Sequence, residues 1–287
     1  GEKVKALVRL PSCGAVTLIP AGEAGKEAEG ADGPGKGAES QAEAGRLMTE
    51  RHQEEAGGLT GRQTAPGGQV TVSRTKEGFV MENSCLRAAV NGKGEVTSFI
   101  LKESGREFAA GAMNRFRFYK DVPRKFDAWD IDSNYTDQEI EALGGTEAEV
   151  LSQGLEGVLK IRGRIGNSDI VQHIRLAAGS RRLEFETEIC WRELHRLLKV
   201  SFPAEVYAEN GINEMQFGYV ERPTHRSKPY DRDRFEVCNH RYSALCDGGH
   251  GAAVLNDSKY GISMNQNALE LSLLRASASP ELRADNR

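Results

Sequence analysis

Between residues 183 and 191 apolar and polar side chains alternate at every position. The apolar set is Leu183, Phe185, Thr187, Ile189 and Trp191, and the polar set is Glu184, Glu186, Glu188 and Cys190. Successive side chains of a β-strand point to opposite faces, so this segment predicts a strand with one buried face and one face in water. A helix would place the two sets on overlapping faces.

The same period of two returns along most of the chain after residue 70. It predicts further strands at 79–81, 86–90, 96–101, 158–165, 170–176, 198–202, 215–220, 235–237, 252–255 and 269–274. Turn-forming glycine and asparagine lie at 91–94 and 166–168, where they predict hairpins. One turn of helix near 137–143 is the exception. The pattern predicts an all-β fold, a large antiparallel β-sandwich.

The first 69 residues have a different character. Residues 4–10 and 15–19 read as two short strands joined by residues 11–14, and they are too short to fold alone. Residues 21–69 hold 12 of the 32 glycines and no Val, Ile, Phe, Tyr or Trp. Such a segment buries too little apolar area to offset the chain entropy. We therefore expect three parts: a strand pair of a small β domain (1–20), a low-complexity linker (21–69) and the sandwich (70–287).

Charge and cysteine content exclude several classes of protein. With 38 basic and 42 acidic residues the formal net charge is −4, which argues against nucleic acid as a partner. No apolar run approaches the ~18 residues of a membrane span. The five cysteines are scattered and odd in number, as expected for free thiols in the cytoplasm.

The histidines do not predict a metal site. None of them forms a His-x-His, His-x-Asp or His-Glu-x-x-His motif. A catalytic zinc ion needs about three protein ligands, and no local segment supplies them. We therefore expect this chain to bind no metal.

Two polar segments are candidates for chemistry. In the first, Asp127–Asp132, an extended backbone would place Asp130 and Asp132 on one face and Trp129 with Ile131 on the other. Carboxylates beside an aromatic ring suit a sugar site, whereas the alternative is a loop that buries its tryptophan and caps turn amides with its aspartates. In the second, residues 217–242, charged and aromatic side chains are dense, which indicates either a functional loop or a solvated rim of ion pairs.

At these segments the sequence resembles family-38 glycoside hydrolases, the retaining α-mannosidases, in their C-terminal region. Four stretches carry the resemblance: residues 127–132 (DAWDID), 182–203, 217–226 (FGYVERPTHR) and 235–261, and residues 271–280 continue it. The resemblance implies a galactose-mutarotase-like supersandwich preceded by a small β segment. It also implies that the zinc site and the catalytic aspartate lie in an N-terminal α/β domain, which this sequence lacks. Both ends of the chain are expected to be cut, and the chain alone is expected to be inactive.

The resemblance further implies partners and contact residues. The expected partners are a mannose-containing oligosaccharide and the N-terminal catalytic domain of the same parent protein. The candidates for the rim of the substrate pocket are Asp130, Glu221, Arg222, Thr224 and His225. The alternative is a free-standing carbohydrate-binding sandwich with no catalytic parent.

Overall fold

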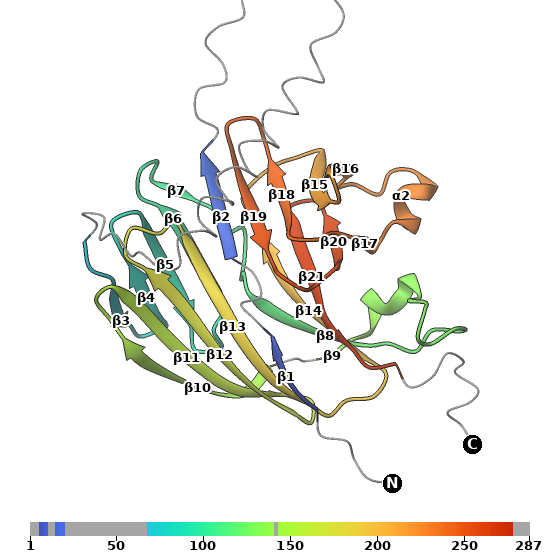
Figure 1. Ribbon diagram of the computed structural model, residues 1–287, viewed down its shortest axis with the longest axis horizontal. Coiled ribbons are helices and arrows are strands. Elements are labelled where there is room, and N and C mark those ends of the chain that lie inside the picture. The colour runs from blue at the N-terminus through green and yellow to red at the C-terminus, as the bar shows by residue number, and fades with distance from the viewer. Residues whose placement is uncertain (1–5, 11–14, 21–67, 141–142, 278–287) are drawn as a thin grey trace, which may run out of the picture.

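The computed structural model describes residues 6–10, 15–20, 68–140 and 143–277, and antiparallel strands make up most of this part of the chain (Figure 1). Within it the helical segments are short, a 3-10 helix η1 (Ser133–Gln138) and an α-helix α2 (Pro229–Asp233). The all-β prediction is confirmed. The predicted linker, except for its last two residues, and Cys13 lie outside the described residues.

The largest sheet has ten strands. Its main path runs β10-β11-β12-β13-β2-β19-β18-β15-β16, and β1 also pairs with β13. The bounds of its strands are β1 (Ala6–Leu10), β2 (Ala15–Pro20), β10 (Leu143–Ser152), β11 (Glu156–Ile165), β12 (Ser168–Ala177), β13 (Arg182–Trp191), β15 (Asn210–Met215), β16 (Gly218–Pro223), β18 (Tyr242–Cys246) and β19 (His250–Leu255).

Two smaller sheets complete the fold. The six-stranded sheet has the order β17 (Val237–Cys238), β20 (Gly261–Asn265), β21 (Ala268–Arg275), β14 (Arg196–Pro203), β8 (Arg115–Lys120) and β9 (Glu139–Ile140). The five-stranded sheet has the order β3 (Thr71–Arg74), β4 (Gly78–Glu82), β5 (Leu86–Asn91), β6 (Val96–Leu101) and β7 (Arg106–Glu107).

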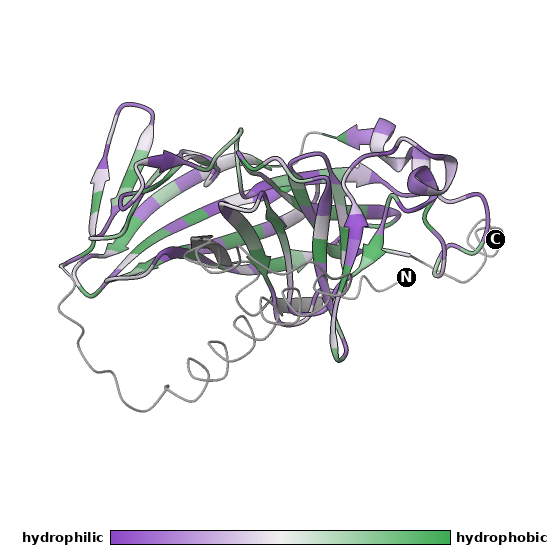
Figure 2. Ribbon diagram, turned by 90° about the horizontal axis from the view of Figure 1, so that it is seen from above, coloured by the Kyte–Doolittle hydropathy of each residue, from purple (hydrophilic) through white to green (hydrophobic). Residues whose placement is uncertain are grey.

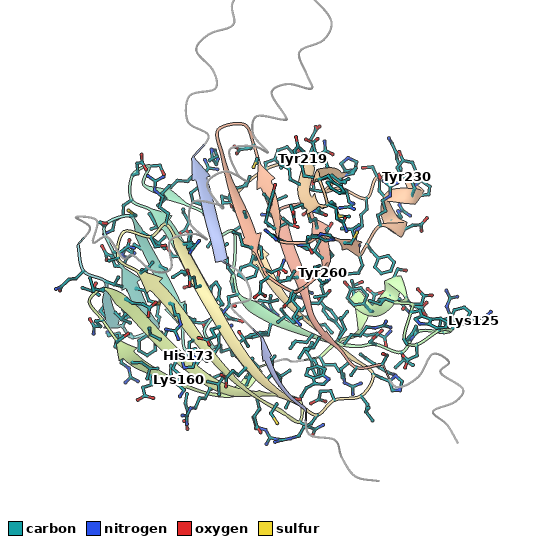
Figure 3. The ribbon with its side chains drawn as sticks, in the orientation of Figure 1. Lys125, Lys160, His173, Tyr219, Tyr230 and Tyr260 are labelled. Atoms are coloured by element: carbon teal, nitrogen blue, oxygen red, sulfur yellow. The ribbon has the colours of Figure 1, made fainter. Side chains whose placement is uncertain are left out.

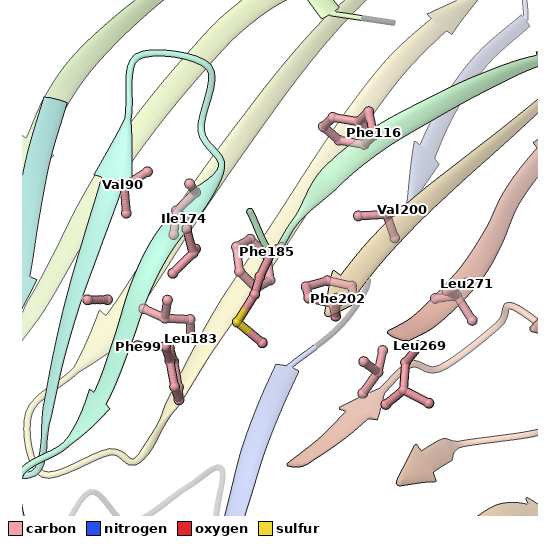
Figure 4. Close-up of a cluster of buried hydrophobic side chains, with 14 of the residues drawn as sticks. Val90, Phe99, Phe116, Ile174, Leu183, Phe185, Val200, Phe202, Leu269 and Leu271 are labelled. Carbon is pink, nitrogen blue, oxygen red and sulfur yellow. The ribbon is translucent and has the colours of Figure 1, made fainter. Parts of the chain in front are cut away.

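Side chains from all three sheets form one continuous apolar core. Hydrophobic and hydrophilic residues alternate along the long strands, as the sequence predicts (Figure 2). At the centre of the core Phe185 of β13 lies against Phe202 of β14, with ring centroids 5.8 Å apart (Figure 4). Both rings are fully buried, and burying a side chain of this size contributes roughly 1.5–3 kcal/mol. This contact joins the ten-stranded sheet to the six-stranded sheet.

The strands expected near the N-terminus are present, but they do not pair with each other. β1 pairs with Thr187–Trp191 of β13, and β2 lies between Arg182–Glu184 of β13 and the whole of β19. Both strands thus belong to the large sheet. The reason is that β13 is long enough to pair with two short strands along the same edge. The division into 1–20, 21–69 and 70–287 stays a prediction.

Two local predictions are wrong. The single strand expected at 215–220 is interrupted by the two-residue turn of the β15–β16 hairpin at 216–217, where Phe217 has a φ of +67°; Met215 ends β15 and residues 218–220 begin β16. The helical turn expected at 137–143 begins earlier, as η1, and Glu139 and Ile140 pair with β8. At 216–217 the chain reverses, and the period of the sequence does not reveal a reversal.

Candidate functional site

Asp130 lies on the surface, in the loop that joins β8 to η1. Its Oδ1 accepts a hydrogen bond from the amide of Ile131 at 2.9 Å, and its carbonyl oxygen accepts one from the Arg275 guanidinium. The neighbouring Trp129 is 75% exposed and stacks against Phe126. The loop therefore does not bury its tryptophan, as the alternative required, but its aspartates do bond backbone amides as that alternative expected: Asp130 accepts from Ile131, and Asp132 accepts from Arg124 at 3.0 Å.

Glu221 and Arg222 lie on β16, the strand at one edge of the ten-stranded sheet. The Glu221 side chain is exposed. Arg222 Nη1 donates to Asn213 Oδ1 at 2.7 Å and to the Cys238 carbonyl at 3.2 Å. Arg222 thereby connects β16 to the buried Asn213 of β15 and to β17 of the other sheet. Glu221 is free to meet a ligand, whereas Arg222 is already engaged in holding strands together.

Thr224 and His225 follow directly after β16. Thr224 is buried, and its hydroxyl donates to the Ala208 carbonyl at 2.6 Å. His225 is about half exposed, and its Nδ1 lies 3.9 Å from Asp231 Oδ2. Asp231 Oδ2 also accepts the amide of Lys228 at 3.0 Å, so it fixes the first turn of α2. Thr224 holds the backbone, and His225 is the more accessible group.

The five predicted residues do not form one constellation. Among the described residues no hydrogen bond or ion pair joins Asp130 to any of the other four. In Figure 1, β16, α2 and η1 follow one another down the right-hand side of the molecule. The structure thus places Glu221, Arg222, Thr224 and His225 on one segment and Asp130 on a separate loop.

A buried ionic cluster, not predicted from the sequence, lies on the second face of the six-stranded sheet. β14 is buried on both faces: Leu198, Val200 and Phe202 enter the apolar core, and Lys199 with Ser201 points the other way. Lys199 has no exposed surface. A charge this deeply buried must be paired and hydrogen-bonded, because the loss of hydration is otherwise very unfavourable.

The partners of Lys199 satisfy all three of its donors. The ammonium contacts the Glu236 carboxylate, Tyr135 OH at 3.3 Å and Ser263 Oγ at 3.0 Å. Tyr135 OH donates to Glu236 Oε1 at 2.6 Å, and Ser272 Oγ donates to Glu236 Oε2 at 3.3 Å. These contacts fasten η1 and the segment before β17 onto the sheet.

A second ion-pair group adjoins this cluster. Arg117 of β8 pairs with Glu139 at 2.6 Å and with Glu270 of β21. The bond to Glu139 raises the pKa of Arg117, and the same bond lowers the pKa of Glu139. Burial, and then the charge of Glu236, raises the pKa of Tyr135, which therefore stays a neutral donor. In the sequence, the single lysine Lys199 within the mainly apolar run at 197–202 was the signal for the buried ionic cluster.

The described residues do not fit a zinc ion. They contain no group of three or more His, Cys, Asp or Glu side chains that could hold a metal. His250 pairs with the carboxylate of Asp247 at 2.8 Å. His173, labelled in Figure 3, lies on the outer face of β12, and burial lowers its pKa. We therefore derive no chemical step from zinc in this chain.

Two hollows on the described surface contain none of the predicted site residues. One lies against the five-stranded sheet, beside Lys76, Phe79 and Arg87, and a smaller one lies against β10 and β11. The described cysteines Cys85, Cys190, Cys238 and Cys246 are free thiols. No helix in the described part of the chain is both long and apolar enough to cross a membrane.

Comparison with known proteins identifies the family. Residues 81–283 match the family described as "Glycosyl hydrolases family 38 C-terminal domain". Alpha-mannosidase 2C1 of Homo sapiens is 40% identical over 219 residues, which are 75% of this chain and 21% of that protein. Alpha-mannosidase G of Dictyostelium discoideum is 33% identical over 211 residues, which are 71% of this chain and 19% of that protein. The chain thus spans about one fifth of the length of these relatives.

The fold agrees with the same family. The crystal structure of an alpha-mannosidase from Enterococcus faecalis V583 superposes with a TM-score of 0.58 at 14% identity, over 72% of this chain and 26% of that chain. At this identity the likeness concerns the fold alone. The resemblance expected from the sequence is confirmed by the family match, by the relatives and by this fold. The chain belongs to glycosyl hydrolase family 38 and carries the C-terminal domain of that family.

Proposed function

We propose that this chain is the non-catalytic β region of a retaining α-mannosidase that hydrolyses terminal α-linked mannose. The catalytic aspartate and the zinc site would lie in an N-terminal domain outside this chain. The observation that carries the proposal is the 40% identity to an alpha-mannosidase of which this chain spans only 21%. The absence of a fitting donor set for zinc among the described residues agrees with it.

In this proposal the chain contributes to the rim of the substrate pocket and to the interface with the catalytic domain. Asp130, Glu221 and His225 are exposed enough to hydrogen-bond the hydroxyls of a mannose-containing oligosaccharide. Arg222 and Thr224 would act by holding the backbone of β16, since both already bond groups of this chain. A retaining glycosidase uses two carboxyl groups, one as nucleophile and one as acid and base, and we assign neither to this chain.

Three further features belong to the same proposal. The three sheets would form the galactose-mutarotase-like supersandwich, which the shared core of all three supports. The protein would be cytoplasmic, in keeping with the free thiols of the four described cysteines. It would bind neither nucleic acid nor a membrane, in keeping with a formal net charge of −4.

The coding sequence upstream of Gly1 tests the proposal. We expect it to encode a long α/β segment that contains a His-x-Asp motif. A start codon beside Gly1 would overturn the proposal in favour of a free-standing carbohydrate-binding sandwich. That second candidate is favoured by one observation, the exposed stack of Phe126 and Trp129.

A further inference from the structure

The loop between β8 and η1 presents two aromatic rings to solvent. Trp129 is 75% exposed and Phe126 is 46% exposed. Their ring centroids lie 6.0 Å apart with an interplanar angle of 28°, so the two rings stack on each other. The indole thus keeps most of its apolar surface in water. We call Phe126, Trp129 and Asp130 the aromatic platform.

The backbone holds the two rings in place. Phe126 has a φ of +56°, a left-handed conformation that is unfavourable for a residue with a side chain. Its carbonyl oxygen accepts hydrogen bonds from the amides of Trp129 and Asp130, both at 2.8 Å. These two bonds close a tight turn that sets the indole against the phenyl ring. Such strain persists only where the surroundings fix it, and it gathers at binding sites.

Side chains beneath the loop anchor it to the sheets. The Arg275 guanidinium at the end of β21 bonds the carbonyl of Asp130, and its Nε donates to the buried Asp121 at 2.5 Å. Asp127 is fully buried and lies 3.5 Å from His195, which precedes β14. The loop is therefore fixed at both sides of Trp129. In Figure 3 Lys125 marks its outer end, away from the sheets.

The chemistry of the platform suits a sugar ring. The face of an aromatic ring is electron-rich and attracts the polarised C–H groups on the apolar face of a hexose. Asp130 Oδ2 receives no hydrogen bond from the described residues, so it can accept hydroxyl groups of a ligand.

We propose that the aromatic platform is a saccharide subsite, in which Trp129 stacks on one hexose ring and Asp130 accepts its hydroxyls. That this hexose is α-linked mannose rests on the function proposed above. The subsite is separate from the β16 segment, so the chain would contact an oligosaccharide at more than one point. A weak site of this kind has a Kd of about 1 mM.

Fluorescence titration of the full chain tests the subsite. The chain has two tryptophans, so Trp191→Phe leaves Trp129 as the single reporter. We expect α-linked mannobiose, titrated to roughly fifty times that Kd, to give a saturable change in emission. Trp129→Ala should weaken binding about tenfold when it is followed by calorimetry, and Trp129→Phe, which keeps a ring, should weaken it less. Asp130→Asn should also weaken binding.

The matched control is Tyr207→Ala, which removes an aromatic ring that is 83% exposed and lies outside the platform. This variant should bind mannobiose like the parent chain. An emission that does not change with mannobiose would overturn the subsite, and so would binding that Trp129→Ala leaves intact. Neither result bears on the function proposed above, which depends on the upstream coding sequence. Equal weakening by Tyr207→Ala would likewise overturn the assignment to the platform.

Discussion

Replacing Lys199 by methionine tests whether the buried ionic cluster holds the second layer of the six-stranded sheet. Methionine keeps the length and most of the volume of the side chain, so little packing is lost. The change removes the ammonium that bonds Glu236, Tyr135 and Ser263. The Glu236 side chain, only 15% exposed, then keeps its charge without its cation.

The expected effect is large. Removing one partner of a buried ion pair typically lowers the free energy of unfolding by about 3–5 kcal/mol, because the other charge stays buried. The double variant Lys199→Met with Glu236→Gln removes both charges, and it should recover part of that loss. The matched control is Arg181→Met, which breaks an exposed pair with Glu103 at 2.5 Å and should lower the free energy of unfolding by less than about 1 kcal/mol.

Urea denaturation followed by circular dichroism measures these differences, provided the slope against urea is the same for each variant. A Lys199→Met variant as stable as Arg181→Met would show that the buried cluster does not stabilise the fold. A double variant whose loss of stability equals the sum of the losses of Lys199→Met and Glu236→Gln alone would show that the two side chains do not interact, and it would contradict the assigned pair.

Other predictions concern the tyrosines of the same cluster and one strand end. Tyr119→Phe should leave the free energy of unfolding unchanged or raise it, since the buried Tyr119 hydroxyl has no hydrogen-bond partner among the described residues. Tyr135→Phe should lower the free energy of unfolding by about 1–3 kcal/mol, because it removes the hydrogen bond to Glu236. Burial raises the pKa of both phenols, so their contribution to the free energy of unfolding should be constant up to pH ~10 and fall above it, because the unfolded chain loses these protons first. Each Phe variant should reduce that fall in urea titrations at alkaline pH. Gly78→Ala should lower the midpoint of thermal unfolding, because φ is +147° at this position and a Cβ would lie 2.2 Å from the Val90 carbonyl oxygen. The control Gly92→Ala should leave the midpoint unchanged, because there is open space around Gly92.

Much of the fold could be predicted from the sequence because its long strands bury one face only. β13 alternates in the structure as it does in the sequence, with Glu184, Glu186 and Glu188 on the outer face. β10 was missed for a physical reason: it is an edge strand whose side chains, after Leu143, are exposed or half-exposed. Without a buried face, a strand has no need of a period of two.

The candidate site was harder to predict, since it depends on contacts between distant segments. The sequence could mark Asp127–Asp132 as unusual, but only the structure shows Trp129 in solvent and Asp127 in the interior. Thr224 lies in a polar run and yet is buried, because its hydroxyl bonds a carbonyl 16 residues away. Lys199 pairs with Glu236, 37 residues later in the chain. The periodicity of hydrophobic residues along a strand does not predict such a pair.

We propose that this chain serves an α-mannosidase without being its catalytic part. The direct test is the turnover of an aryl α-mannoside by the purified, folded chain, measured with and without added zinc. We expect no hydrolysis above the buffer blank in either condition, in a sample whose near-ultraviolet circular dichroism shows packed aromatic side chains. Hydrolysis at the rate of an ordinary glycosidase, growing in proportion to the amount of chain, would contradict it.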